Sequence, residues 1–349
     1  MHNLQLTEDQ DMIVDTVCKF VADAVAPAVL ELDEHRRFAK GLFDGLAELG
    51  VFGVPVAEAN GGAGMGLVPF VAALEAVGAH SGSLARLWIG QAMAAAALEA
   101  SGHAALGEVL GGALATFVAA ADGLVLAGGR LQGSAPLCIG GGEAAHFVAI
   151  ANDGGKSVLV LVDGAKVQRQ PLRALGLHSA APARVTFASA DATVLASGEA
   201  AVAAGQRAEL VAWLGTAAAA VGGGLGACEQ ASKHAGERIA FGKPLLAQEA
   251  VQLKLVEARR QLAGARQLTF HAARLADLGQ DAVEAALQAR IAAVDAMVLA
   301  ADEAIQIQGG FGYTVEYHVE RHYRDGKTLE VLDGGNAALK NRLAALQFA

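Results

Sequence analysis

Near its C-terminus the chain reads RDGKTLEVLDGGNAALKNR, in which Asp333 follows an apolar pair and precedes two glycines. A carboxylate can act as a general base when it lies within hydrogen-bond reach of the proton that it removes. Two glycines after an acid are typical of a tight turn, or of backbone that approaches another group closely. Asp333 is therefore either a catalytic carboxylate or the residue left where one used to be.

A second stretch, GERIAFGKPLLAQEAVQ, places Arg238 and Lys243 on either side of a break between two expected helices. An arginine at a helix end beside such a turn can hold a phosphate group through two parallel hydrogen bonds. The same cations can instead oppose the helix macrodipole at a C-terminus. Spacing alone does not decide between the two interpretations.

Two further patterns favour structural interpretations. The stretch NGGAGMG, residues 60–66, lacks the preceding strand of a dinucleotide-binding unit, so a plain loop is favoured. His318 and His322 stand four residues apart, a spacing that can chelate a metal on one helical face. No third ligand is evident in the sequence, so we expect a solvated, charged helix and no metal site.

The composition restricts the class of protein. A chain of 349 residues exceeds what one hydrophobic core usually organises, so two or three domains are expected. Much of its apolar content is alanine, the best helix former, which predicts a largely helical protein. The formal net charge of −10 argues against nucleic acid and against an anionic membrane as partners.

Cysteine usage and hydropathy bear on location. Cys18, Cys138 and Cys228 are sparse and far apart, which fits a reducing, cytoplasmic compartment better than a disulfide framework. The N-terminus has no basic flank with an early apolar block, so it does not resemble a signal peptide. Residues 210–228 carry no charge and approach the ~20 residues of a membrane span. Because they are mostly alanine and glycine, we expect a buried bundle helix and no membrane span.

The hydrophobic period changes twice along the chain. Apolar residues recur at helical spacing to about residue 112, beginning at a Thr7 cap followed by acids. Short runs with Val, Phe and Thr, broken by Gly, Asp and Asn, then predict strands to about residue 200, and long helical patterns follow. This order predicts an α+β fold, mostly α, with a helical domain at 1–112, a small β-domain at 113–200 and a helical bundle at 201–349.

The stretch AIQIQGGFGYTVEYHVERHYRDGKTLEVLDGG closely resembles the C-terminal signature of the acyl-CoA dehydrogenases. RIAFGKP is similar to the same family's Arg-x-x-Phe-Gly-Lys-Pro, and LAELGVFGVPVAEANGGAGMG resembles its opening helices. The resemblance covers nearly the whole chain. It implies an N-terminal helical domain, a β-barrel-like middle domain and a C-terminal four-helix bundle.

The resemblance also implies an activity. Members of that family bind FAD and oxidise an acyl-CoA thioester, with a Glu that takes the α-proton while the flavin accepts the β-hydride. By resemblance, Asp333 stands at the position of that Glu, and Gly335 at that of a Thr. Asp is one methylene shorter, and a misplacement of roughly 1 Å can cost about a hundredfold in rate. The implied partners are an acyl-CoA substrate and an electron-transfer flavoprotein or similar acceptor.

Several family features are missing, whereas others are retained. Trp213 stands where the resemblance leads us to expect an arginine, and the family's Thr-Glu-x-x-x-Gly-Ser-Asp loop at the start of the middle domain is absent. The β-domain is also short. The retained residues match positions that, in the family, contact the ADP half of a neighbouring protomer's FAD; they are Arg238, Phe241, Gln306, Gly309 and Gly310.

We therefore expect the non-catalytic subunit of an FAD-dependent, heteromeric acyl-CoA dehydrogenase with α2β2 composition. Such assemblies resemble those that act on CoA thioesters of steroids, which predicts a role in lipid metabolism and steroid catabolism. Two alternatives stay open. The chain can be a self-sufficient homo-oligomeric enzyme with Asp333 as its base, or a flavin-free scaffold protein.

Overall fold

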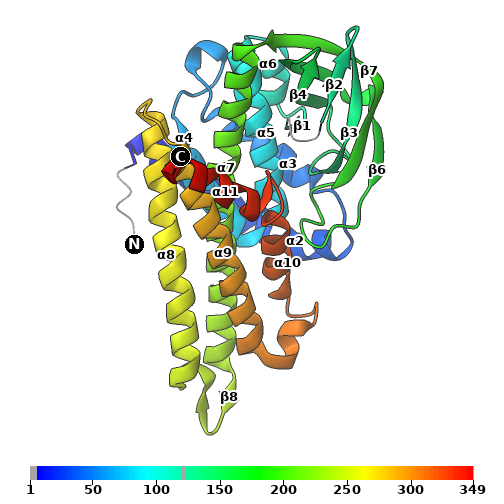
Figure 1. Cartoon of the computed structure of the whole chain (residues 1–349). Coiled ribbons are helices and arrows are strands. Elements are labelled where there is room, and N and C mark those ends of the chain that lie inside the picture. The colour runs from blue at the N-terminus through cyan, green and yellow to red at the C-terminus, as the bar shows by residue number, and fades with distance from the viewer. Residues whose placement is uncertain (1–5, 120–122, 349) are drawn as a thin grey trace.

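The structure is a computed structural model that describes residues 6–119 and 123–348 (Figure 1). Its first part is helical, as the sequence predicts. Thr7 caps the first helix, and its hydroxyl and the Gln10 side chain form the reciprocal bonds of a capping box. The helices of this part are α1 (Glu8–Phe20), with a π-helical turn at Val21–Val25, α2 (Ala26–Glu34), α3 (Lys40–Glu48), α4 (Leu67–His80), α5 (Gly82–Ser101) and α6 (Ala105–Leu110).

The strands follow α6 and form a sheet that closes on itself. They are β1 (Ala115–Val118), β2 (Val125–Ala127), β3 (Arg130–Cys138), β4 (His146–Asp153), β5 (Lys156–Asp163), β6 (Gln168–Pro171) and β7 (Ala183–Ser197). The pairing path runs β4-β2-β3-β7-β5 and returns to β4, while β1 pairs with β4 and β6 with β7. This is the barrel-like arrangement that the resemblance implies.

One strand was not expected from the sequence. All residues of β1 are buried, so it shows none of the alternation that marks a half-buried strand. The link from β1 to β2 includes residues 120–122, which lie outside the described residues. The family's Thr-Glu-x-x-x-Gly-Ser-Asp loop would fall in this region, so its absence is an observation on the sequence alone.

The C-terminal part is a helical bundle. Its elements are α7 (Glu199–Glu237), α8 (Glu249–Asp277), α9 (Val283–Gln308), α10 (Glu320–Leu329) and α11 (Gly335–Phe348), with a short hairpin of β8 (Ile239–Ala240) and β9 (Lys243–Pro244) between α7 and α8. In Figure 1 the long helices run from the sheet toward this hairpin, which projects at the opposite end of the molecule. The boundaries proposed for three domains stay a prediction.

Helix α7 is the core of the bundle. Among the described residues it is the one helix long and apolar enough to cross a membrane, but 89% of its apolar window is buried inside the protein. Glycines let α4 approach it closely. A Cβ on Gly222 would lie 2.0 Å from the Glu75 carbonyl oxygen, and one on Gly78 would lie 2.4 Å from the Ala219 oxygen. The expectation of a buried bundle helix is confirmed.

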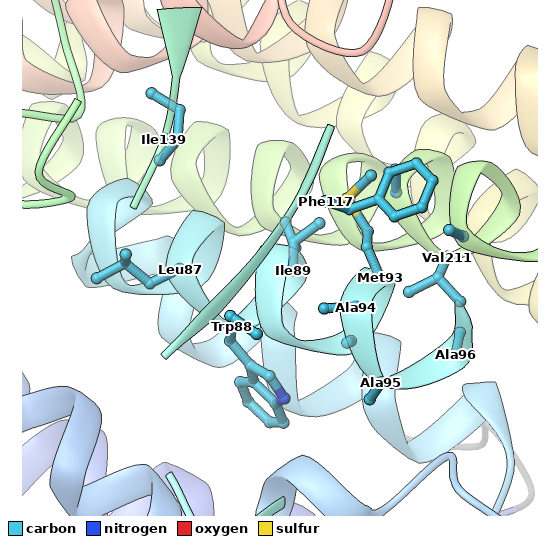
Figure 2. Close-up of a cluster of buried hydrophobic side chains, with 14 of the residues drawn as sticks. Leu87, Trp88, Ile89, Met93, Ala94, Ala95, Ala96, Phe117, Ile139 and Val211 are labelled. Atoms are coloured by element: carbon cyan, nitrogen blue, oxygen red, sulfur yellow. The ribbon is translucent and has the colours of Figure 1, made fainter. Parts of the chain in front are cut away.

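Helix α5 lies between the N-terminal helices, the sheet and α7 (Figure 2). On one side, the fully buried Trp88 makes edge contacts with Phe52 and Phe70 of the N-terminal part. On another side, Met93 lies beside Phe117 of β1. This packing fixes α5 against both the sheet and the bundle, so its remaining face can position charged side chains accurately.

Candidate functional site

A cleft of about 230 Å³ lies between α5, strands β1 and β3, and the turn formed by residues 331–334. Arg86, Gly90 and Met93 form its helical wall, because residues spaced four and three apart share one face of a helix. The opposite wall is largely apolar and consists of residues 116–119 and 135–139. The charged side chains of Arg86 and Asp333 thus line a small, mostly apolar space.

Asp333 lies in a turn of unusual backbone conformation. Its φ is +54°, and the following Gly334 and Gly335 have φ of +93° and +75°. Glycine adopts this left-handed region at no steric cost, and Asp tolerates it better than most residues. The turn directly follows α10 and is closed by the Gly335 amide, which donates to the Leu332 carbonyl at 2.9 Å.

The carboxylate of Asp333 is bound by an arginine. Arg86 Nη1 donates to Oδ2 at 3.0 Å and Nη2 donates to Oδ1 at 2.6 Å, while the Thr216 hydroxyl of α7 donates to Oδ2 at 3.3 Å. The two charged side chains are only 9% and 10% exposed. Bidentate arginine–carboxylate pairs are among the strongest hydrogen-bonded contacts in proteins. Both carboxylate oxygens are therefore occupied by protein donors.

A second buried arginine supports the turn that contains Asp333. Arg290 of α9 is fully buried and donates to the carbonyls of Leu329 and Leu332 at 2.7 and 2.8 Å, and also to the Asn336 side chain. Burial lowers the pKa of Arg290, and the negative charge of Asp333 opposes that shift. Arg290 therefore fixes the backbone that precedes Asp333 and the Asn336 side chain that follows it.

Sequence reasoning placed Asp333 in the site but missed Arg86. Arg86 is the one charged residue in the stretch 82–98, which is otherwise apolar or small. A lone cation inside an apolar helix is costly to bury without a partner, so this arginine signals a buried acid elsewhere in the chain. That signal was available in the sequence.

The five retained residues come together at the far end of the bundle. Arg238 ends α7 and is exposed, Gln306 is exposed near the end of α9, and Gly309 with Gly310 follows that helix. Phe241 occupies the tip of the β8–β9 hairpin, where it is 96% exposed. We call residues 234–244 and 306–317 the hairpin end; Figure 1 shows the hairpin projecting away from the sheet.

The hairpin end carries exposed aromatic side chains as well as cations. Phe311 stacks on Tyr317 with ring centroids 4.8 Å apart, and His234 of α7 contacts the edge of the same tyrosine. Phe311 is 50% exposed and Tyr313 is 75% exposed. These rings form the exposed aromatic surface of the hairpin end, and contiguous apolar patches on a protein surface can mark interaction sites.

The expectation of a solvated, charged helix around His318 and His322 is wrong. His322 lies on α10, is 1% exposed and forms a 3.0 Å hydrogen bond with Gln230 of α7. Burial holds the pKa of His322 well below its usual value, so the ring is neutral. His318 precedes the helix and faces a separate surface cleft with Glu316. The sequence missed the burial because the helix is strongly polar.

Helix α10 also carries a buried acid. Asp325 is 2% exposed, and its carboxylate accepts a hydrogen bond from the Leu177 amide at 2.7 Å. Burial raises the pKa of Asp325 to about 6. Through this bond, α10 holds the segment that precedes β7, so Asp325 has a structural role. The charges of α10 serve packing between the sheet and the bundle.

Comparison with known proteins identifies the family. The family model described as acyl-CoA dehydrogenase, N-terminal domain, matches residues 7–116, and the one described as acyl-CoA dehydrogenase, C-terminal domain, matches residues 211–347. The chain is 30% identical to benzylmalonyl-CoA dehydrogenase of Aromatoleum aromaticum over 97% of both proteins. The chain belongs to the acyl-CoA dehydrogenase family.

Solved structures of this family agree in fold. Butyryl-CoA dehydrogenase of Megasphaera elsdenii superimposes with a TM-score of 0.90 at 22% identity, covering 100% of both chains. The steroid ACAD Tcur3481-Tcur3483 matches with a TM-score of 0.84 at 25% identity, covering 97% of both chains. Acyl-CoA dehydrogenases are FAD-dependent oxidoreductases, so the chain is part of an FAD-dependent enzyme.

The chain's own cleft does not fit the cofactor and substrate of an acyl-CoA dehydrogenase. Sites that enclose a drug-sized ligand usually have volumes of about 300 to 1,000 Å³. The cleft has about 230 Å³, and the Arg86 guanidinium contacts the acid at the base position. A flavin ring beside an acyl group needs more space than this. We therefore derive no chemical step through this cleft.

Two other departures from the acyl-CoA dehydrogenase pattern are now visible in the structure. Trp213 is 2% exposed, and the cation over its ring is Arg342 of α11, at 4.6 Å. Gly335, at the position of the family's Thr, has a φ of +75° that strains a β-branched residue. The turn has thus lost more than a hydroxyl group, because its backbone now disfavours a β-branched residue at this position.

Proposed function

We propose that the chain is the non-catalytic subunit of a hetero-oligomeric acyl-CoA dehydrogenase. The assembly carries out FAD-dependent α,β-dehydrogenation of an acyl-CoA thioester. This chain contributes its hairpin end to the ADP part of FAD that is bound mainly by a catalytic partner. The observation that carries the proposal is the bidentate hold of Arg86 on Asp333.

A general base needs a free oxygen within about 2.6 to 3.2 Å of the proton that it abstracts. In this chain Arg86 and Thr216 donate to the Asp333 carboxylate at 2.6 to 3.3 Å. Separating a buried ion pair costs about 3 to 5 kcal/mol when one partner is left without a counter-charge. A substrate would therefore have to overcome that cost before Asp333 could act.

The hairpin end has the chemistry that a nucleotide tail requires. Arg238 is exposed and presents a planar guanidinium, which binds phosphate through two parallel hydrogen bonds. Gly309 and Gly310 give a backbone that another molecule can approach closely, because neither has a Cβ. The exposed rings of Phe241 and Phe311 supply apolar surface for a planar group.

The comparisons support a cyclic acyl substrate and a second subunit. The steroid ACAD that the chain resembles at 25% identity carries the names of two proteins, which supports a second subunit. Benzylmalonyl-CoA, the substrate in the name of another relative, contains an aromatic ring, which supports a cyclic acyl group. We place the substrate of the assembly among CoA thioesters of steroids or similar ring systems. The α2β2 composition, the cytoplasmic location and the domain division at 112 and 200 are part of this proposal.

The test is to express the chain alone and together with a candidate catalytic acyl-CoA dehydrogenase from the same genome. We expect a colourless protein without activity from the chain alone, and flavin and activity from the pair. A yellow, active protein from this chain alone refutes the proposal. Flavin absent from every co-purified complex supports the scaffold alternative instead.

The self-sufficient enzyme remains the second candidate because Asp333 does line the cleft, with 10% of its side chain exposed. It requires Arg86 to leave the carboxylate when substrate binds. This candidate predicts a homo-oligomer with one FAD per chain, whose turnover is lost in Asp333→Asn. Turnover unchanged by that substitution excludes Asp333 as the base.

A further inference from the structure

We propose that Arg86 is an internal plug: its guanidinium occupies the acyl end of this chain's own cleft and excludes neutral acyl groups from it. This inference rests on the proposed function, since it names the residue that closes the inactive site. It assigns a specificity-determining role to Arg86.

The shape of the cleft is the first observation that supports the plug. Met93, Gly90 and Arg86 follow one stripe of α5, and the seven-residue step from Arg86 to Met93 spans about 10 Å of helix. Gly90 leaves room for a Cβ in the middle of the stripe, because one built there would be at ordinary contact distance, 3.9 Å, from its nearest neighbours on β1. The groove therefore runs along α5 until the Arg86 side chain and Asp333 close it.

The contact between the Arg86 and Asp333 side chains is the second observation that supports the plug. The guanidinium nitrogens lie 2.6 and 3.0 Å from the Asp333 oxygens, the distances at which a base meets the proton donor that it serves. The Arg86 guanidinium therefore lies against Asp333 in the place where the reacting carbon of a substrate would lie. Both side chains are nine-tenths buried, so the guanidinium is held in place rather than free to move in solvent.

The charge of the plug decides which ligands it excludes. A neutral acyl group offers Arg86 no counter-charge, so displacing the guanidinium would weaken binding by a factor of roughly a hundred to several thousand. A ligand with its own carboxylate could pair with Arg86 only by leaving the buried Asp333 charge without its partner, so it gains no affinity either. The plug is therefore tested by comparing a neutral and a carboxylated acyl-CoA on the same chain.

The experiment measures binding by calorimetry on the full-length chain, with free CoA, butyryl-CoA and glutaryl-CoA as probes. For the wild-type chain we expect butyryl-CoA and glutaryl-CoA to bind no more tightly than CoA. The double variant Arg86→Ala/Asp333→Asn removes both charges of the ion pair together, so neither is left without the other. We expect it to bind butyryl-CoA at least tenfold more tightly than CoA.

Two further variants keep the test specific. Adding Gly90→Leu to the double variant fills the groove from α5, and we expect the gain in butyryl-CoA affinity to disappear. Arg260→Ala removes an exposed arginine on α8 and serves as the matched control, with no gain expected. If the double variant does not fold, Arg86→Lys replaces the planar guanidinium by a smaller ammonium group. We expect this variant to show a smaller gain in butyryl-CoA affinity.

Three results overturn the plug. They are tighter binding of butyryl-CoA than CoA by the wild-type chain, tighter binding of glutaryl-CoA by that chain, and no gain in either plug variant. Flavin content of the wild-type chain, measured on the same samples, separates this outcome from failure of the proposed function. A flavin-free chain without a gain in the variants overturns the plug alone, whereas a flavin-loaded wild-type chain overturns the subunit role.

Discussion

Arg86 and Asp333 lie 247 residues apart in the sequence, yet the guanidinium of the first contacts both carboxylate oxygens of the second. Arg86 comes from a helix of the N-terminal part, whereas Asp333 follows the last turn of α10. Their ion pair therefore ties the two helical parts together across the cleft. By the resemblance, Asp333 stands where the family has its base, and in this chain its carboxylate forms a buried ion pair.

The first prediction concerns the stability of this pair. Arg86→Met leaves the buried Asp333 charge without a partner, and we expect the free energy of unfolding to fall by about 3 to 5 kcal/mol. The double variant Arg86→Met/Asp333→Asn removes both charges, and Asn tolerates the left-handed backbone at 333. We expect it to recover most of the loss in urea denaturation. Equal losses in the single and double variants would contradict a buried pair.

The second prediction concerns the turn after Asp333. Because Gly335 has a φ of +75°, restoring the family's threonine there as Gly335→Thr should destabilise the fold by about 1 to 3 kcal/mol. Gly335→Asn is the matched control, since asparagine accepts this conformation and should cost less. Thermal unfolding of both variants measures the difference. A threonine variant as stable as the wild type would show that the turn is not left-handed.

The third prediction concerns pH. Burial raises the pKa of Asp325 to about 6 in the folded chain, above its value of 3.8 when exposed. Between these values the folded state holds a proton that the unfolded state has released, so this group's contribution to stability falls as pH rises from about 4 to 6. Relative to Asp325→Asn, the wild type should lose up to about 3 kcal/mol over that range.

The control for this effect is Asp153→Asn, which alters an exposed carboxylate on β4. Urea denaturation of the three proteins at pH 4, 5, 6 and 7 gives the slopes. His322 has the opposite effect on stability, because burial lowers its pKa and proton uptake at acid pH therefore favours the unfolded state. This contribution is the same in all three proteins, so it cancels when their curves are compared. Parallel curves for the wild type and Asp325→Asn would contradict the buried acid.

The fourth prediction concerns the hairpin end. In the complex with its catalytic partner, Arg238→Ala removes a guanidinium that we assign to cofactor phosphate, and we expect about tenfold weaker retention of FAD. Arg260→Ala, an exposed arginine that pairs with Glu257 on α8, is the control and should leave retention unchanged. Flavin fluorescence after gel filtration measures the released fraction. Equal retention in both variants would remove Arg238 from the cofactor site.

Sequence patterns predicted the fold well wherever one face of an element is buried. The Thr7 cap, the strands rich in Val, Phe and Thr, and the long helices all have local signals that survive in the folded chain. The patterns failed at one short strand that is buried throughout and at one polar helix that is largely buried. Strand β1 shows no alternation, and α10 looks solvated although Arg321 and His322 are buried.

The candidate site was half predictable. Asp333 and the residues of the hairpin end stand in motifs with fixed spacing, so the sequence alone identified them. The partner of Asp333 could not be assigned, because pairing across 247 residues depends on the packing of α5 against the turn. The lone charge at Arg86 required some buried acid, but the sequence does not say which one.

Flavin stoichiometry tests the central claim most directly. The chain is purified alone and together with a candidate catalytic acyl-CoA dehydrogenase from the same genome, and bound FAD is quantified per polypeptide after denaturation. We predict no FAD on the chain alone and one FAD per heterodimer in the complex. One FAD per chain in a homo-oligomer of this protein, with activity toward an acyl-CoA, would contradict the claim that it serves a partner's cofactor.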